Sequence, residues 1–175
     1  MAGIDFQETY SLVAKFASIR MILAIVAHLD LELFQIDVKT TFLNEELKED
    51  IYMRQLEGFQ VEGQENKVCK LKKKLYGLKQ SSRQWYLKFH NVIIQLGFIP
   101  NQLDNCVYVM KSGSKFVILS LYVDDILLAE NDIEMLNKVK SELSGKFEMK
   151  DMGEASYVLG VQILRDRKSR ILSIN

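Results

Sequence analysis

The sequence predicts an α+β fold in which a mostly antiparallel sheet packs on helices. One observation is an apolar run at residues 115–129, whose Val, Ile, Leu, Phe and Tyr content is typical of two short strands joined by a turn. The other is the order of periodic segments along the chain, which predicts helix, strand, helix, hairpin, helix and strands. A chain of 175 residues has the length of one domain and can bury a core.

The N-terminal part predicts a long helix followed by a strand. Apolar residues recur near the 3.6-residue helical period over residues 11–29, and Ser11 is the expected N-cap. Residues 31–38 alternate, with Leu31, Leu33, Gln35 and Asp37 on one face and Glu32, Phe34, Ile36 and Val38 on the other. Both faces are largely apolar, which predicts a strand covered on both sides. Asp37 then lies inside or at the end of a buried strand.

The rest of the chain predicts a series of shorter elements. We expect a turn and short helix at 40–50, a strand at 51–53, a polar loop at 57–66, a basic segment at 68–76, and a helix from Ser81 or Ser82 to Gly97. Strands are expected at 106–110, 147–153, 157–164 (with Gly160 inside) and 171–174, and a helix capped by Asn131 or Asp132 should follow the hairpin.

Composition limits the classes of protein that the chain can belong to. Lys plus Arg equals Asp plus Glu, at 23 each, so any nucleic-acid-binding surface must be local rather than global. Two cysteines, Cys69 and Cys106, are too few for a disulfide framework and fit a reducing compartment. No apolar stretch reaches the roughly 18 residues of a membrane-spanning helix, and the N-terminus lacks the pattern of a secretory signal.

Two adjacent carboxylates, Asp124 and Asp125, interrupt the apolar run at the expected hairpin turn. Turns tolerate Asp well, so one interpretation is a surface turn with two solvated acids. The other is a metal site, because carboxylates this close repel each other and a hard cation such as Mg²⁺ removes the repulsion. Asp37 has the same two interpretations. If its strand lies beside the hairpin, three acids converge, as phosphoryl transfer with two metal ions requires.

Several stretches resemble one protein family, in the family's order. Tyr122, Val123, Asp124 and Asp125 match the YxDD signature of reverse transcriptases. The other matching stretches are GIDFQETYSLVA, ASIRMILAIVAHLDLELFQIDVKTTFLN, IYMRQLEGF, VCKLKKKLYGLKQSSRQWY, LSLYVDDILLA and FEMKDMGEASYVLGVQI. Together they cover nearly the whole chain, which therefore resembles the reverse transcriptases of Ty1/copia-type retrotransposons.

The resemblance implies a set of site residues. Asp37, Asp124 and Asp125 would be catalytic and, with the backbone of Val38, would bind two Mg²⁺ ions, with Mn²⁺ as a substitute. Nucleotide contacts are implied at Phe42, Gln80, Tyr122 and Lys150, and nucleic-acid contacts at Lys72, Lys73, Lys74, Lys79, Arg83, Leu159 and Gly160. Two simpler interpretations stay open: Phe42 as a core aromatic, and each lysine as part of a solvated face.

The resemblance also implies an architecture and an activity. Residues 1–175 would be a single fragment of the reverse transcriptase domain, a palm with partial fingers and a catalytic hairpin at 116–129. The upstream fingers segment, the thumb and the RNase H domain would lie outside it. The activity would be RNA-dependent DNA polymerisation on an RNA template and DNA primer from deoxynucleoside triphosphates. The reaction would take place inside the cell, in the cytoplasm or in a virus-like particle, and would involve no membrane.

Departures from the family pattern leave a second hypothesis. The family usually has Pro where Leu12 and Leu56 stand, often Pro in place of Ser82, and often Gly in place of Glu130. A drifting copy, or one kept by its host under relaxed selection, would show such losses. The alternative is therefore a non-catalytic remnant that at most binds nucleic acid or a protein. An interaction module with an accidental acidic turn would not retain the ordered motifs.

Overall fold

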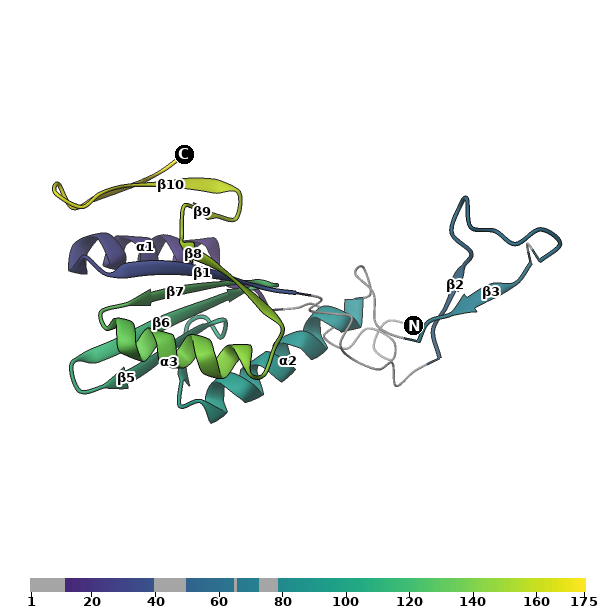
Figure 1. The fold of residues 1–175 in the computed structure, drawn as a ribbon, viewed down its shortest axis with the longest axis horizontal. Coiled ribbons are helices and arrows are strands. Elements are labelled where there is room, and N and C mark those ends of the chain that lie inside the picture. Colours follow the sequence, from purple (N-terminus) through teal and green to yellow (C-terminus); the bar gives the residue numbers. More distant parts are fainter. Residues whose placement is uncertain (1–11, 40–49, 65, 73–78) are drawn as a thin grey trace.

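The computed structural model describes residues 12–39, 50–64, 66–72 and 79–175, and for Lys79 and Gln80 it describes the backbone only. A six-stranded sheet forms its centre, in the order β4-β5-β6-β7-β1-β8 (Figure 1). Its strands are β1 (Glu32–Val38), β4 (Ile99–Pro100), β5 (Val107–Ser112), β6 (Lys115–Tyr122), β7 (Asp125–Glu130) and β8 (Met149–Glu154). Every neighbouring pair is antiparallel, which confirms the predicted sheet type.

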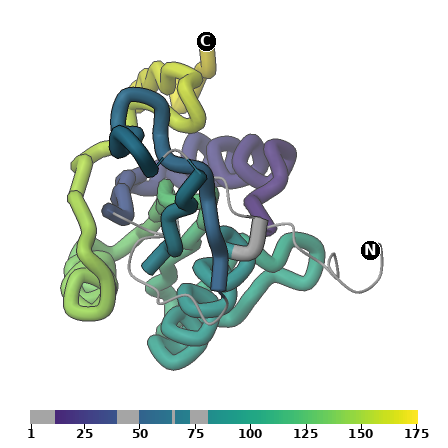
Figure 2. The backbone as a smooth tube through the Cα atoms, turned by 90° about the vertical axis from the view of Figure 1, so that its right-hand side faces the viewer, coloured from purple at the N-terminus to yellow at the C-terminus, as the bar shows by residue number. Residues whose placement is uncertain are grey.

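Helices cover both faces of this sheet. Helix α1 (Phe16–Leu29) lies on one face, and α2 (Lys79–Gln95) and α3 (Ile133–Ser144) lie on the other (Figures 1 and 2). The buried residues of α1 are Ile19, Ile22, Leu23 and Val26, spaced as the 3.6-residue period requires. In the part of the chain that the structure describes, no helix is long and apolar enough to cross a membrane.

The face covered by α2 holds an aromatic cluster. Trp85 and Phe89 of α2 contact Phe147, with ring centroids 5.2 and 5.8 Å from it. Tyr108 of β5 packs edge-on against Phe89. All four side chains are buried. This cluster fixes α2 beneath the sheet, at the end where the β6–β7 turn lies.

Two smaller sheets lie outside the central one. Strands β9 (Tyr157–Val158), β10 (Val161–Asp166) and β11 (Ile171–Ile174) form a three-stranded sheet on the side of α1 (Figure 1). Strands β2 (Tyr52–Arg54) and β3 (Val68–Lys70) form a hairpin that extends away from the six-stranded sheet (Figure 1).

Several element boundaries differ from the sequence prediction. Helix α1 begins at Phe16, with Lys15 as its N-cap, and the expected cap Ser11 lies outside the described residues. Helix α2 begins at Lys79, before Ser81 and Ser82. The expected strand at 157–164 is instead a hairpin that turns at Leu159 and Gly160. The capping of α3 by Asp132 is confirmed, because its carboxylate accepts a hydrogen bond from the Met135 N–H.

Candidate active site

The hairpin β6–β7 carries the two adjacent acids at its turn. Tyr122 pairs with Asp125, so the turn has two central residues, Val123 and Asp124. Val123 has a φ of 57°, in the left-handed region. A β-branched residue rarely adopts this backbone conformation, which costs on the order of 1–3 kcal/mol. The Trp85 indole N–H of α2 donates to the Val123 carbonyl at 2.6 Å and holds the turn in place.

Strand β1 brings the third acid to this turn. Asp37 is directly opposite Asp125 in the β1–β7 ladder, and the Val38 N–H donates to the Asp124 carbonyl at 2.9 Å. Residues directly opposite in an antiparallel pair have Cα atoms roughly 4.5–5.5 Å apart and side chains on the same face. The prediction that the strand ending near Asp37 lies beside the hairpin is confirmed. All three acids are half-buried.

Charges of both signs meet at Asp37. Burial raises the pKa of its carboxyl, and the charges of Asp124 and Asp125 raise it further. The ammonium groups of Lys150 and Lys39 lower that pKa but do not cancel the shift. Lys150 is opposite Asp37 in the β1–β8 ladder and is exposed. An acidic pair and a lysine therefore lie in a row across β7, β1 and β8.

The donor chemistry of this row fits a hard cation. Carboxylate oxygens are the ligands that Mg²⁺ prefers. Burial raises the pKa of Asp37 most, and the neighbouring charges of Asp124 and Asp125, which raise it further, are charges that a cation would neutralise. The side chains are not closed around an ion, however. Within the described ranges, no group of three or more His, Cys, Asp or Glu side chains is arranged to hold a metal. The three acids are thus neighbours along the backbone of β1 and of the β6–β7 turn, but their side chains do not form a coordination shell.

Gln35 is a candidate site residue that the sequence analysis did not identify. It lies on the acid-bearing face of β1, and its amide Nε2 donates to Asp125 Oδ1 at 2.9 Å. This bond fixes one oxygen of the Asp125 carboxylate. The position of Gln35 two residues before Asp37 was a usable signal, because it puts both side chains on one face of the strand.

The other residues expected at the site fall into three groups. Tyr122 and Leu159 line a cavity of about 10 Å³ together with Gln35 and Asp125, so the β9–β10 turn, with Gly160, lies against the acid-bearing hairpin. Lys72 is exposed just after β3, and Arg83 lies in α2, half-buried. Phe42, Lys73 and Lys74 lie outside the described residues, and the structure shows only the backbone of Lys79 and Gln80.

Comparison with known proteins places these features in a family. The sequence model of the family described as "Reverse transcriptase (RNA-dependent DNA polymerase)" matches residues 1–174. The chain belongs to the reverse transcriptase family. Among curated proteins, it is 50% identical over 171 residues to the retrovirus-related Pol polyprotein from transposon TNT 1-94 of Nicotiana tabacum. It is 39% identical over 163 residues to the corresponding polyprotein from transposon RE1 of Arabidopsis thaliana.

These relatives identify the type of reverse transcriptase. The Ty1-DR5 Gag-Pol polyprotein of Saccharomyces cerevisiae is 30% identical over 133 residues, or 74% of this chain. The chain is thus a reverse transcriptase domain of the Ty1/copia retrotransposon type, and the predicted family is confirmed. The matches cover 97% and 93% of the chain but only 13% and 11% of the tobacco and Arabidopsis polyproteins. No match to a solved structure was found.

Membership in this family has general consequences for the site. Reverse transcriptases generally use divalent metal ions, a nucleic-acid template and nucleotide substrates. The acid-bearing turn and the strand of Asp37 lie within the matched residues.

Proposed function

We propose that this reverse transcriptase domain polymerises DNA on an RNA template, with Asp37, Asp124 and Asp125 as its catalytic carboxylates. The observation that carries the proposal is the cross-strand pair of Asp37 and Asp125 beside Asp124. This pair brings two residues that are distant in sequence, Asp37 and Asp125, to neighbouring positions on one face of the sheet. The motifs around both residues lie in the stretch that matches the family.

We assign separate roles in this reaction to the metal-binding, orienting and nucleotide-contacting residues. The three carboxylates and the backbone of Val38 would hold two Mg²⁺ ions, which supply charge neutralisation for the transferring phosphoryl group. Gln35 would keep Asp125 oriented through its 2.9 Å hydrogen bond. Lys150, exposed and opposite Asp37, would lie beside the nucleotide phosphates. Phe42, Gln80 and Tyr122 would contact the nucleotide.

The template and primer would be held mostly by parts of the polyprotein outside this domain. Net charge is zero, so only local basic residues can attract a duplex: Lys72, Lys73, Lys74, Lys79 and Arg83, with Leu159 and Gly160 at the primer end. We propose that this is a palm with partial fingers, and that flanking fingers and thumb segments complete the clamp. In an intact element it would act inside a virus-like particle in the cytoplasm.

Primer extension tests the proposal. The assay uses an RNA template, a DNA primer and Mg²⁺, with residues 1–175 and with a longer polypeptide that adds the flanking segments. We expect trace extension or none from residues 1–175, because the chemistry depends on positioning the primer end and nucleotide. The longer polypeptide should extend the primer.

Two variants give the assay its controls. Asp124→Asn should lower extension by at least about a hundredfold, since one preorganised electrostatic group is worth on the order of 10²–10³ in rate. Glu134→Gln, which removes an exposed charge on α3, should extend like the unchanged chain. Failure of the longer polypeptide to extend would favour a non-catalytic remnant, and robust extension by residues 1–175 would show that the flanking clamps are unnecessary.

A further inference from the structure

The turn between β9 and β10 lies against the acid-bearing hairpin in a demanding conformation. Val158 pairs with Val161, which leaves Leu159 and Gly160 as the two central residues. Their φ angles are 50° and 78°, so both are in the left-handed region. Leucine pays a steric cost there that glycine does not, of about 1–2 kcal/mol. Something beyond local preference must hold this turn in place.

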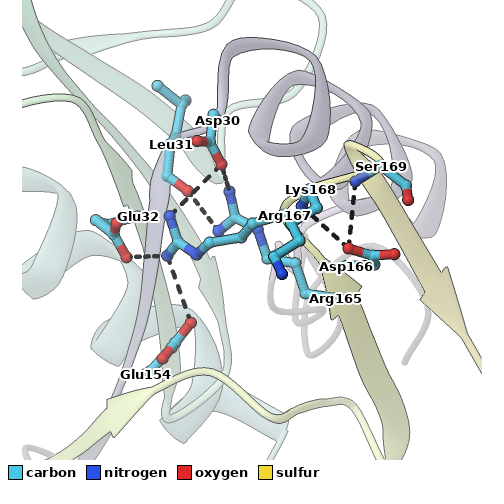
Figure 3. A network of polar contacts seen from close by, with 9 residues as sticks. All are labelled: Asp30, Leu31, Glu32, Glu154, Arg165, Asp166, Arg167, Lys168 and Ser169. Carbon is cyan, nitrogen blue, oxygen red and sulfur yellow. Dashed lines mark hydrogen bonds and ion pairs between the residues drawn. The ribbon is translucent and has the colours of Figure 1, made fainter.

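The opposite end of β10 is fastened by Arg165. Along β10, Val161, Ile163 and Arg165 alternate on the inward face, so the arginine takes the last inward position of the strand. Its guanidinium donates to the Leu31 carbonyl at 2.6 Å and to the Asp30 carboxylate at 2.7 Å (Figure 3). The side chain is 12% exposed, so these are partly desolvated, charge-assisted hydrogen bonds.

Arg167 adds a more exposed set of ion pairs beside it. Its guanidinium contacts Glu32, lies 3.6 Å from Glu154 and 3.5 Å from Asp30 (Figure 3). Its side chain is 39% exposed, so these pairs contribute less than the bonds of Arg165. Both arginines end on the short junction between α1 and β1, and Glu154 is on β8 beside it.

The junction is a rigid place to fasten a strand. Asp30 is the C-cap of α1, with a φ of 52°, and its backbone N–H bonds to the Val26 carbonyl. Leu31 is buried, and β1 begins one residue later. Strand β1 runs from this junction to Val38 and carries Asp37 near its end, so β10 and Asp37 are both held relative to the same junction.

Besides the contacts of Arg165 and Arg167, one backbone hydrogen bond joins the segment before β9 to the central sheet. It joins the Ala155 N–H to the Leu33 carbonyl at 2.9 Å, before β9 begins. The turn therefore lies between two anchors. From Arg165 to Gly160 the strand covers roughly 17 Å at about 3.3 Å per residue. A stiff strand of that length transmits the position of Arg165 to the turn.

We propose that Arg165 is a positioning residue of the polymerase site. By fastening β10 to Asp30 and Leu31, it holds the Leu159–Gly160 turn over the acid-bearing hairpin, where the turn supports the primer end. The assignment of the turn to the primer end rests on the proposed function. The planar guanidinium is suited to this task because it serves a carbonyl and a carboxylate at the same time, which an ammonium does less well.

Amide hydrogen exchange on the 175-residue chain tests the fastening without any need for activity. Arg165→Met should raise exchange in residues 156–164 about tenfold, the scale set by losing hydrogen bonds to charged groups, and leave β6 and β7 unchanged. Lys168→Met removes the same charge from the adjacent turn and should change nothing. Equal exchange in these two variants would overturn the proposal.

Milder substitutions protect the test against global unfolding. If Arg165→Met also raises exchange in β6 and β7, Asp30→Asn and Arg165→Lys are examined instead. Asn tolerates the left-handed backbone at position 30, and both variants should raise exchange in residues 156–164 alone. Their effects and that of the double variant should be non-additive, because they remove one interaction. Full additivity would contradict the assigned contact.

Primer handling in the longer polypeptide tests the positioning role. Arg165→Met should weaken binding of a primer–template duplex about tenfold and raise its KM similarly, while kcat at saturation and KM for the nucleotide change less than about threefold. Arg165→Lys should recover part of the loss. Raised exchange with unchanged duplex binding would reduce Arg165 to a structural residue. If no variant extends a primer, the proposed function fails, while exchange and duplex binding still decide the role of Arg165.

Discussion

Asp37 lies between charges of opposite sign on neighbouring strands. It faces Asp125 across one ladder and Lys150 across the other. Burial, Asp124 and Asp125 raise the pKa of its carboxyl, and the two nearby lysines oppose them. Like charges that are held together by strand register cannot move apart without breaking the sheet. The fold therefore maintains a repulsion that a bound divalent cation would relieve.

Thermal unfolding with and without Mn²⁺ tests whether a divalent cation relieves that repulsion. Millimolar Mn²⁺ should raise the Tm of the 175-residue chain, because a ligand that binds only the folded state stabilises it by mass action. Asp124→Asn combined with Asp125→Asn should abolish the rise, and without metal this double variant should be at least as stable as the unchanged chain. Glu134→Gln should keep the full response. No Tm shift in the unchanged chain would mean that the fragment forms no metal site.

At the scale of elements, the N-terminus of helix α1 is capped by a residue that is distant in sequence. Lys15 makes no side-chain cap, and Asp104 takes that role from 89 positions away. Its carboxylate accepts from the Lys15 N–H at 2.8 Å, the Ser18 hydroxyl at 2.6 Å and the Cys106 N–H at 3.1 Å. The loop before β5 and the first turn of α1 are thereby joined, next to negative charge that favours a helix N-terminus.

This junction predicts a pH-dependent stability. Burial alone would raise the pKa of Asp104, but the hydrogen bonds from Ser18, Lys15 and Cys106 outweigh it and hold that pKa below its ordinary value of 3.8. A carboxyl with a lowered folded pKa stabilises the fold above pH 3.8, and this contribution is lost as the pH falls through the lower folded value.

Asp104→Asn isolates the effect. It should reduce the free energy of unfolding by about 1–3 kcal/mol at pH 7, because an amide NH₂ then faces a donor. The difference from the unchanged chain should shrink as the pH falls below 3.8, where Asp104 is first protonated in the unfolded chain and then, at its lower folded pKa, in the native state. Urea unfolding at pH 7 and pH 3 gives both numbers. A difference that is the same at both pH values would show that the charge of Asp104 has no part in capping α1.

At the scale of the whole molecule, the β2–β3 hairpin and the central sheet differ in how much of their apolar surface is buried. The β2–β3 hairpin has strands of three residues, and Tyr52, Leu56, Phe59 and Val68 are all more than half exposed. An isolated two-stranded hairpin is at best marginally stable in water. The central sheet is instead covered by α1 on one face and by α2 and α3 on the other.

Native-state hydrogen exchange should resolve this division. Amides of β2 and β3 should exchange with little protection, by local opening, while those of β6 and β7 should exchange only through global unfolding. Low urea concentrations should leave the hairpin amides nearly unaffected and accelerate the β6 and β7 amides. Equal protection in both regions would indicate that the hairpin is docked on a further surface.

Sequence reasoning located the acids but missed most of what fixes them. The convergence of Asp37 with the hairpin was predictable, because buried apolar strands with acids at their ends suggested one sheet and one site. The bond from Gln35 to Asp125, and the cap that Asp104 supplies to α1, depend on pairing between distant segments, which periodicity does not encode. Periodicity indicated a continuous strand at 157–164, because leucine is a poor choice for the left-handed backbone of the turn at Leu159. Only the family resemblance implied a hairpin at Leu159 and Gly160.

The position of β1 in the sheet has a consequence for synthesis on the ribosome. Strand β1 lies between β7 and β8, so both of its partners are encoded about 90 to 120 residues after it. At a synthesis rate of roughly 5–20 residues per second, β1 waits on the order of 5–25 s before either partner emerges. Throughout that interval its apolar faces and unpaired edges are open to other nascent chains. The first strand of the candidate active site therefore needs chaperone protection during translation.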